Sequence, residues 1–107
     1  MIRWYTLVGT VPVATSPEDA EALFSDLDAR RVAYTEVAEG VEVSTVFLVL
    51  DHQHGAGPPL LFETIVFWPT SSMDNEMERC GTWKEAEQMH GAMVERVRHA
   101  LESLRTP

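Results

Sequence analysis

The chain of 107 residues has one cysteine, no long apolar run and few basic residues, and each shortage excludes a class of protein. Cys80 has no second cysteine with which to form an internal disulfide, and a zinc site built on paired thiolates is excluded for the same reason. No apolar stretch approaches the about 20 residues that span a bilayer, and the N-terminus lacks the basic and apolar regions of a signal peptide. We therefore expect a cytoplasmic protein that does not act in a membrane.

Basic residues are scarce beside acidic ones: eight Lys and Arg stand against seventeen Asp and Glu, a formal net charge of −9. The imbalance is uneven, because residues 1–78 hold thirteen acids and three bases, whereas residues 79–107 hold four acids and five bases. Nucleic-acid binding depends on Lys and Arg contacts with phosphate, so we expect no direct nucleic-acid binding. One interpretation of the acidity is that it keeps the protein soluble. The other is a surface that binds a basic protein partner, which could be a protein that normally binds nucleic acid.

The composition is otherwise that of an ordinary folded protein, with 45% apolar and 23% charged residues. The length predicts a single domain over 1–107. Ser16-Pro17-Glu18-Asp19 is typical of a helix start, and the helix that follows is expected to end near Arg31. A second helix is expected after Thr82, which forms a capping-box pattern with Glu85 and precedes a long apolar stripe that includes His90.

Runs of β-branched and aromatic residues predict the strands. We expect extended segments, separated by turns or helices, at 2–15, 32–37, 42–50 and 60–68. The first of these is expected to bend near Gly9, and Pro12 to lie on an edge or at a bulge. The fold class is α+β: a mostly antiparallel four-stranded sheet with two helices packed on one face, in the order β-α-β-β-β-α. No third helix remains to cover the far face, so we expect a homodimer through it.

The most informative stretch is 43–68, where a loop from Asp51 to Pro59 joins two apolar runs. Carboxylate and imidazole groups bind metal ions, so Asp51 and His52 are candidate metal ligands, and His54 is a candidate binding residue. No cofactor is indicated beyond this. The other interpretation is a polar turn whose Asp and His side chains satisfy backbone groups.

The strand register decides which of these side chains share a face of the sheet. The two apolar runs are expected to form a hairpin in which His52 pairs with Leu60. Glu63 then lies opposite Val49, on the same face as Asp51. A register shift of one residue would reverse this relation.

Glu63 and His90 are candidate catalytic residues, because a buried carboxylate needs a partner and His90 lies on the apolar stripe of the last helix. We expect the two to lie on the same side of the sheet and to make contact directly or through one water or ion. Removing the Glu63 carboxylate alone would then cost roughly 2–4 kcal/mol. The other interpretation is that each is a structural residue, with Arg79 or Arg96 among the possible partners of Glu63.

Two further groups precede the last helix. Cys80, beside Arg79 and near a helix start, is either a reactive thiolate or a small packed residue. The connection before it is polar, and three of its acids are candidate partner-binding residues: Asp74, Glu76 and Glu78.

The central hairpin resembles a family of small phage and prophage proteins. The matching segments, in sequence order, are Ser44-Thr45-Val46-Phe47-Leu48, Asp51-His52 and Gly57-Pro58-Pro59-Leu60-Leu61-Phe62-Glu63-Thr64, followed by Thr82, Ala86 and His90. They follow the family pattern STVFLxxDHxxGxGPPLLFET over roughly residues 32–97, whereas Val49, His54 and the N-terminal third depart from it. The family has no established activity, so the resemblance implies a phage-related origin and a hairpin–helix unit, and no catalytic role.

Two function hypotheses follow. The first is a small acidic phage-type interaction or inhibitor protein, which binds a host or phage protein partner and could antagonise a nucleic-acid-handling or defence complex. The second is a metal-dependent or acid–base enzyme that uses Asp51, His52, Glu63 and His90. A cavity that holds both Glu63 and His90 would favour the enzyme.

Overall fold

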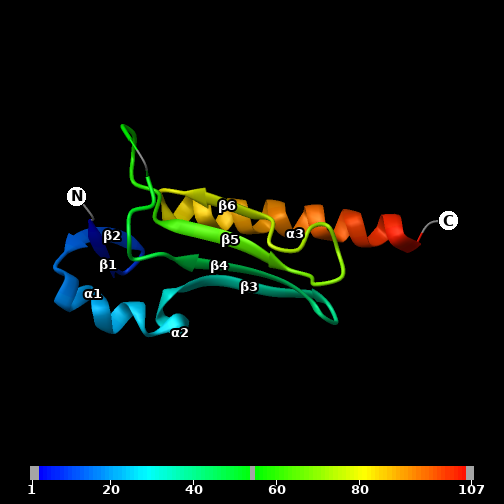
Figure 1. Cartoon of the computed structure of the whole chain (residues 1–107), viewed down its shortest axis with the longest axis horizontal. Coiled ribbons are helices and arrows are strands. Elements are labelled where there is room, and N and C mark those ends of the chain that lie inside the picture. Colours follow the sequence, from blue (N-terminus) through cyan, green and yellow to red (C-terminus); the bar gives the residue numbers. More distant parts are fainter. Residues whose placement is uncertain (1–2, 54, 106–107) are drawn as a thin grey trace.

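The computed structural model describes residues 3–53 and 55–105 and shows an α+β fold (Figure 1). Along the chain its elements are β1 (Trp4–Val8), β2 (Val11–Thr15), α1 (Pro17–Phe24), α2 (Leu27–Arg30), β3 (Arg31–Ala38), β4 (Val41–Phe47), β5 (Phe62–Phe67), β6 (Met77–Cys80) and α3 (Trp83–Arg105). The predicted fold class is confirmed.

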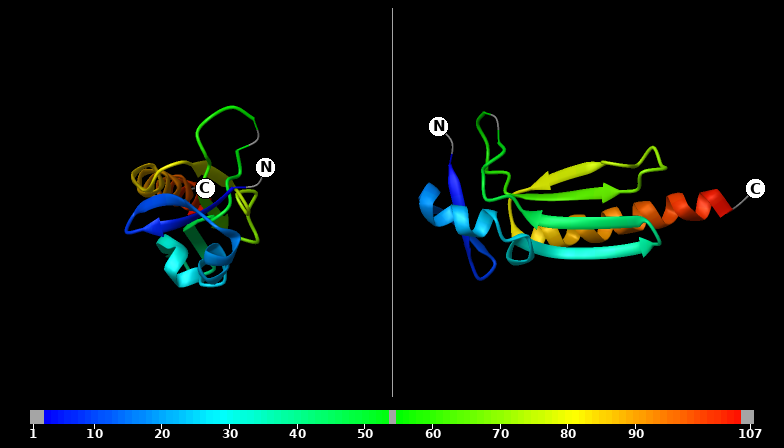
Figure 2. Two further views of the ribbon diagram at one scale, coloured as in Figure 1. Left: turned by 90° about the vertical axis from the view of Figure 1, so that its left-hand side faces the viewer. Right: turned by 60° about the horizontal axis from the view of Figure 1, so that its bottom comes forward.

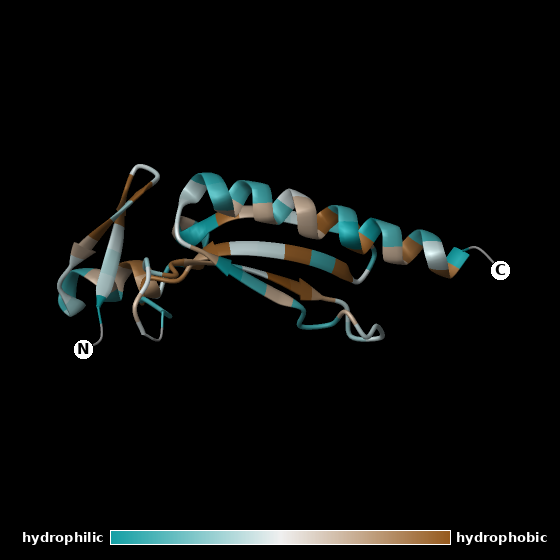
Figure 3. Cartoon of the chain, turned by 90° about the horizontal axis from the view of Figure 1, so that it is seen from above, coloured by the Kyte–Doolittle hydropathy of each residue, from teal (hydrophilic) through white to brown (hydrophobic). Residues whose placement is uncertain are grey.

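The main body is a four-stranded antiparallel sheet in the order β3-β4-β5-β6, with each strand beside its neighbours in sequence. The single helix α3 packs along one face and contacts all four strands. Figure 3 shows α3 on one side of the sheet only, and no described helix runs along the other side. The alternation of side chains in β4 and β5 therefore divides the sheet into a face buried under α3 and a face open to solvent.

The N-terminal third differs from the predicted order of one strand and one helix. The chain turns back at Gly9, whose φ of +63° is easily adopted only without a Cβ, so the segment forms a separate two-stranded hairpin, β1–β2. Pro12 lies in β2, an edge strand, as predicted. Helix α1 packs on β1 and α2, at one end of the sheet (Figure 1), so only one of the two predicted helices covers the sheet face.

The predicted first helix is present but shorter than expected. Ser16 caps α1 by accepting a hydrogen bond from the Asp19 N–H at 3.2 Å. The helix ends at Phe24, and Asp26 begins a second, four-residue helix by accepting from the Ala29 N–H at 3.1 Å. An Asp side chain competes well for free N–H groups at a helix start, which explains the division into α1 and α2.

Two apolar clusters form the core of the molecule. The first joins the N-terminal hairpin to the near end of the sheet and contains Tyr5, Ala20, Phe47, Val49, Leu61, Phe62 and Ala86. The second lies at the far end and contains Val41, Val43, Val66, Trp68, Met93, Val94 and Val97. Buried polar side chains lie between them: Thr45, Thr64 and His90. The core is thus two apolar ends joined through a polar centre.

The molecule is elongated, with extents of 53 × 29 × 22 Å. The hairpin, α1 and α2 lie at one end, and the C-terminal part of α3 projects past the sheet at the other (Figure 1). Within the described residues, no helix is both long and apolar enough to cross a membrane.

Candidate functional site

The loop after β4 begins where the chain leaves the sheet to meet the N-terminal hairpin. Val49 has a left-handed backbone with φ of +71°, and its carbonyl accepts from the Tyr5 N–H at 2.7 Å. Asp51 donates its N–H to the Arg3 carbonyl at 3.2 Å, and an isolated bridge joins Trp4 to Leu50. Residues 49–51 are thereby used to hold β1. The positive φ, rare for a β-branched residue, indicates that this connection is imposed by the tertiary structure.

This diversion changes the predicted register. The His52 N–H does donate to the Leu60 carbonyl at 3.1 Å, as expected. Within the sheet, however, Glu63 lies opposite Val46, so the prediction that it opposes Val49 is wrong. The physical reason is that three residues, 49–51, leave the β4–β5 pairing and pair with β1 instead.

The Asp51 carboxylate organises the loop. Its Oδ1 accepts from the Gln53 N–H at 2.8 Å and from the Leu60 N–H at 3.1 Å, as in the polar-turn interpretation. Among the described residues, no group of three or more His, Cys, Asp and Glu could hold a metal ion. His54, the predicted binding residue beside the two candidate ligands, lies outside the described residues. The assignment of Asp51 and His52 as metal ligands stays a prediction.

The predicted contact between Glu63 and His90 is wrong, because the two side chains lie on opposite faces of the sheet. Glu63 is on the open face, where its Oε2 accepts from the Arg79 Nε at 3.0 Å. Arg79 is its cross-strand neighbour on β6, so the carboxylate finds a cation without reaching α3. An ion pair with this exposure, 32% for Arg79 and 17% for Glu63, contributes about 0–1 kcal/mol, less than the buried pair that the sequence predicted.

His90 lies on the buried face of α3, over the centre of the sheet. Its Nε2 is 2.9 Å from the Thr35 Oγ1, and its Nδ1 is 2.8 Å from the Thr45 Oγ1, which also bonds to Thr64. Burial lowers the pKa of His90, so the neutral imidazole is favoured. His90 is buried, with a relative exposure of 7%, and both of its ring nitrogens contact threonine hydroxyls. This geometry supports a structural role.

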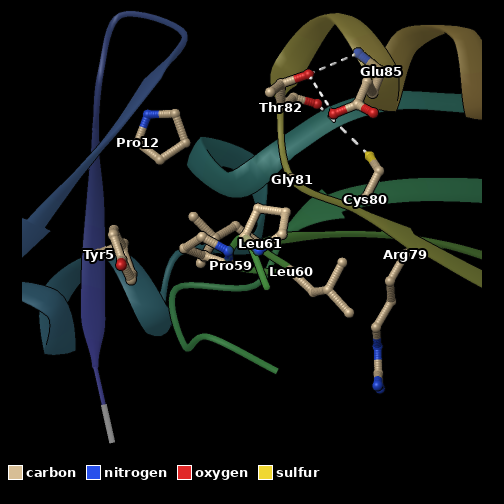
Figure 4. A pocket seen from close by; sticks show the side chains of 11 residues that line it. Tyr5, Pro12, Pro59, Leu60, Leu61, Arg79, Cys80, Gly81, Thr82 and Glu85 are labelled. Carbon is tan, nitrogen blue, oxygen red and sulfur yellow. Dashed lines mark hydrogen bonds between the residues drawn. The ribbon is translucent and has the colours of Figure 1, made fainter. Parts of the chain in front are cut away.

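The main pocket lies elsewhere, between the N-terminal hairpin and the near end of the sheet. It has a volume of about 490 Å³, within the range of about 300–1,000 Å³ typical of ligand sites. Figure 2 shows the hairpin and the 51–61 loop together at this end of the molecule. The walls of the pocket come from the hairpin, the loop and the β6–α3 connection (Figure 4). The lining residues are Tyr5, Pro12, Pro58, Pro59, Leu60, Leu61, Arg79, Cys80, Gly81, Thr82 and Glu85.

One wall is fixed by close packing and by a helix cap. A Cβ at Gly81 would lie 2.8 Å from the Pro59 carbonyl oxygen, so glycine allows the loop to approach the helix start. Thr82 caps α3: its Oγ1 accepts from the Glu85 N–H at 3.2 Å and donates to the Glu85 Oε1 at 2.9 Å. The predicted capping pattern is confirmed.

Four of the polar side chains around the pocket, those of Arg79, Cys80, Thr82 and Glu85, already have partners within the chain. Arg79 is paired with Glu63 on the neighbouring strand, and Glu85 is hydrogen-bonded to Thr82, as Figure 4 shows for the second pair. Burial raises the pKa of the Cys80 thiol, and its Sγ donates to the Thr82 carbonyl at 3.6 Å. Both observations favour the interpretation of Cys80 as a small packed residue over that of a reactive thiolate. The pocket surface is therefore mainly apolar, made of prolines, leucines and the Tyr5 ring, with charged residues at the rim.

The three acidic residues at the start of β6 and in the turn before it have partners within the molecule. Asp74 accepts from the Trp68 N–H at 2.7 Å and closes the turn after β5. Glu76 and Glu78 each lie 3.1 Å from a guanidinium nitrogen of Arg96 and so tie β6 to α3. They lie on the β6–α3 edge and do not line the pocket; their contact with a partner stays a prediction.

Sequence reasoning missed the hairpin wall of the pocket. Tyr5 and Pro12 received no role, because residues 2–15 were expected to form one extended segment. The signal was Gly9-Thr10 between Val8 and Val11, a two-residue turn flanked by β-branched residues. The sequence assigns other roles to three residues of the opposite wall: a partner of Glu63 for Arg79, a thiolate or packed residue for Cys80, and a helix cap for Thr82.

Comparisons with protein-family models, with curated proteins and with solved structures found no match to this chain. The resemblance to phage proteins therefore stays a prediction.

Proposed function

We propose that this chain is a small acidic interaction protein that binds a basic segment of a host or phage protein partner at the pocket beside the N-terminal hairpin. An inhibitor of a nucleic-acid-handling or defence complex is one form of this function. The observation that carries the proposal is the apolar pocket of about 490 Å³, built by three separate parts of the chain. Apolar pockets with a polar rim are the usual places for recognition.

The lining favours an apolar side chain of a protein over a small polar metabolite. A polar ligand needs convergent donors and acceptors that are free to orient it, whereas Arg79 and Glu85 already have partners. Six of the lining residues are prolines, leucines or tyrosine: Tyr5, Pro12, Pro58, Pro59, Leu60 and Leu61. An apolar side chain of the partner, buried in the pocket, would gain binding free energy by leaving water, and no ion pair would have to be broken.

The N-terminal part of the chain, which supplies one wall of the pocket, is acidic, and this charge supports a basic partner. From Arg3 to Arg30 the chain carries five carboxylates and two arginines, and the loop adds Asp51. Charges of one sign at the edge of an interface accelerate the association of an oppositely charged partner and disfavour partners of like charge. A segment with an apolar anchor flanked by Lys or Arg would satisfy both the pocket and its surroundings.

The test compares Pro12→Arg with Val13→Arg. The two residues are neighbours on β2, but Pro12 lines the pocket, whereas Val13 is 42% exposed on the opposite face of the hairpin. We expect immobilised wild-type protein to capture a specific partner from host-cell lysate at low salt and to lose it at high salt. Pro12→Arg should abolish the capture and Val13→Arg should retain it.

A third variant, Pro12→Glu, distinguishes steric blocking of the pocket from charge repulsion of the basic partner. Its side chain also enters the pocket but keeps the acidic sign, so it should weaken capture less than Pro12→Arg does. Circular dichroism confirms that each variant folds. A partner that binds Pro12→Arg as well as wild type, or that binds equally at high salt, would contradict the proposal.

A further inference from the structure

The open face of the four-stranded sheet is distinct from the pocket, and it has an ordered arrangement of charge. The strand register places its side chains in three rows across the strands. The row nearest the hairpin is Arg31, Val46, Glu63 and Arg79; the middle row is Tyr34, Ser44, Ile65 and Met77; the far row is Glu36, Glu42 and Phe67. One end therefore carries two arginines, of which Arg79 is paired with Glu63 in the same row. The other end carries two glutamates, and the centre is apolar.

The apolar centre is accessible. Tyr34, Phe67 and Met77 have relative exposures of 42%, 43% and 46%, and Val46 and Ile65 beside them are half-buried. Such a group of large apolar side chains on one flat face is unusual on a surface that stays in water. Arg31 lies over the Tyr34 ring, 5.0 Å from its centroid, and so is held on this face.

The glutamate row lacks a positive neighbour. Glu36 and Glu42 are direct cross-strand partners, an arrangement of like charges that destabilises a sheet. Glu42 accepts a hydrogen bond from Tyr34, but the salt bridges among the described residues include neither glutamate. A cation from outside the monomer would relieve this repulsion.

We propose that the open face binds a second copy of this chain in an isologous dimer. Two sheets that pack face to face are related by a twofold axis lying in the interface. An axis that runs across the strands places the arginine row of each copy over the glutamate row of the other, with the apolar rows in contact at the centre. An axis along the strands would place arginine over arginine, so the charges select the first arrangement.

The size of the face sets the expected affinity. Strands about 4.8 Å apart with a rise of about 3.3 Å per residue give a face of roughly 20 Å in each direction. That is at the small end of specific interfaces, which commonly bury about 800 Å² per partner. We therefore expect a dimer that dissociates in the micromolar range and whose affinity falls as salt increases.

Sedimentation velocity from about 10 to 500 μM provides the first test, with wild type expected to shift from monomer to dimer across this range. Ile65→Arg places a charge at the centre of the face and should weaken dimerisation by about 100-fold or more. Arg98→Glu, on the exposed surface of α3, is the control and should leave the dimer unchanged. A wild-type monomer at the highest concentration, or a dimer of Ile65→Arg, overturns the proposal.

Mixing two charge variants tests the twofold arrangement. Arg31→Glu and Glu36→Arg should each be monomeric alone, because like charges then face one another across the interface. Mixed in equal amounts they should form a heterodimer, since each glutamate now faces an arginine. Circular dichroism checks folding; if Arg31→Glu does not fold, Ile65→Arg alone decides. Folded variants that remain monomeric when mixed overturn the arrangement. Capture of a partner through Pro12 is independent of these changes, so the two proposals fail separately.

Discussion

His90 shows how the surroundings of a single residue decide between chemistry and structure. A histidine on an apolar helix stripe is compatible with catalysis, with metal binding or with a buried hydrogen-bond network. Here both ring nitrogens contact threonine hydroxyls, Thr35 from β3 and Thr45 from β4. The ring thus links α3 to two strands at the centre of an otherwise apolar interface, where an unpaired imidazole would be costly.

The first residue-scale prediction concerns His90→Gln. Burial lowers the pKa of His90 below its ordinary 6.5, so the folded protein keeps the ring neutral while the unfolded chain protonates near that pH. The stabilising contribution is complete above pH 6.5 and is lost as the pH falls from 6.5 toward the lower pKa of the folded state. At neutral pH the substitution should destabilise by about 1–3 kcal/mol.

Urea denaturation of wild type and His90→Gln at mildly alkaline and mildly acidic pH checks this. The difference in unfolding free energy should be smaller at acidic pH, because only wild type loses the neutral-ring contribution. Other titrating groups are the same in both proteins and cancel in the difference. A difference that is constant with pH would show that the imidazole is not held neutral.

At the scale of elements, a glycine just before α3 and a glycine inside α3 have different roles. Gly81 precedes α3 where the loop touches it, and a Cβ there would lie 2.8 Å from the Pro59 carbonyl oxygen. Gly91 lies inside α3, where a Cβ would have no atom of another element within 4 Å. One glycine is required by packing, and the other is only a weak point of the helix.

Opposite effects on stability are therefore expected from the same substitution. Gly81→Ala should destabilise the protein by about 1–3 kcal/mol, because backbone atoms on both sides must shift to accept the methyl group. Gly91→Ala should stabilise it by about 0.5–1 kcal/mol, since alanine restricts the unfolded chain and favours helix. Chemical denaturation measures both; equal effects would contradict the packing of Pro59 against the helix start.

At the scale of the whole molecule, the N-terminal lobe is joined to the sheet by few polar links. The lobe consists of β1, β2, α1 and α2. Arg30 bridges the lobe to β4 by donating from Nε to the Phe47 carbonyl at 2.9 Å, and its guanidinium also donates to the Phe24 carbonyl within the lobe at 2.9 Å. Tyr5 adds its backbone bond to Val49. Such a unit can open locally without unfolding the sheet.

Hydrogen exchange of Arg30→Met tests this connection. Loss of the two hydrogen bonds, worth about 1 kcal/mol or more, should speed exchange in β1 and β2 by about tenfold while β4 and β5 stay protected. Arg98→Met, which removes an exposed ion pair on α3, is the control. Equal acceleration in the lobe and the sheet would indicate that the two unfold as one unit.

Local sequence determined the features that depend on near neighbours. Ser16 and Thr82 mark the starts of α1 and α3 because a cap needs only a side-chain oxygen and an N–H group three residues away. Runs of β-branched and aromatic residues predicted β3, β4 and β5, and the presence of both strand and helix patterns predicted the α+β class. The uncovered sheet face also followed, since no third long helical pattern is present.

Contacts between distant segments were decided only by the tertiary structure. The hairpin uses Val49–Asp51 for its own pairing, which shifts the β4–β5 register and leaves Glu63 opposite Val46, on the face away from His90. Sequence periodicity cannot show which segment competes for a strand, and a strand's side chains reach one face or the other according to register alone. The pocket arises in the same way, from Tyr5, Pro59 and Thr82, which meet only because the hairpin, loop and helix start are brought to one end of the sheet.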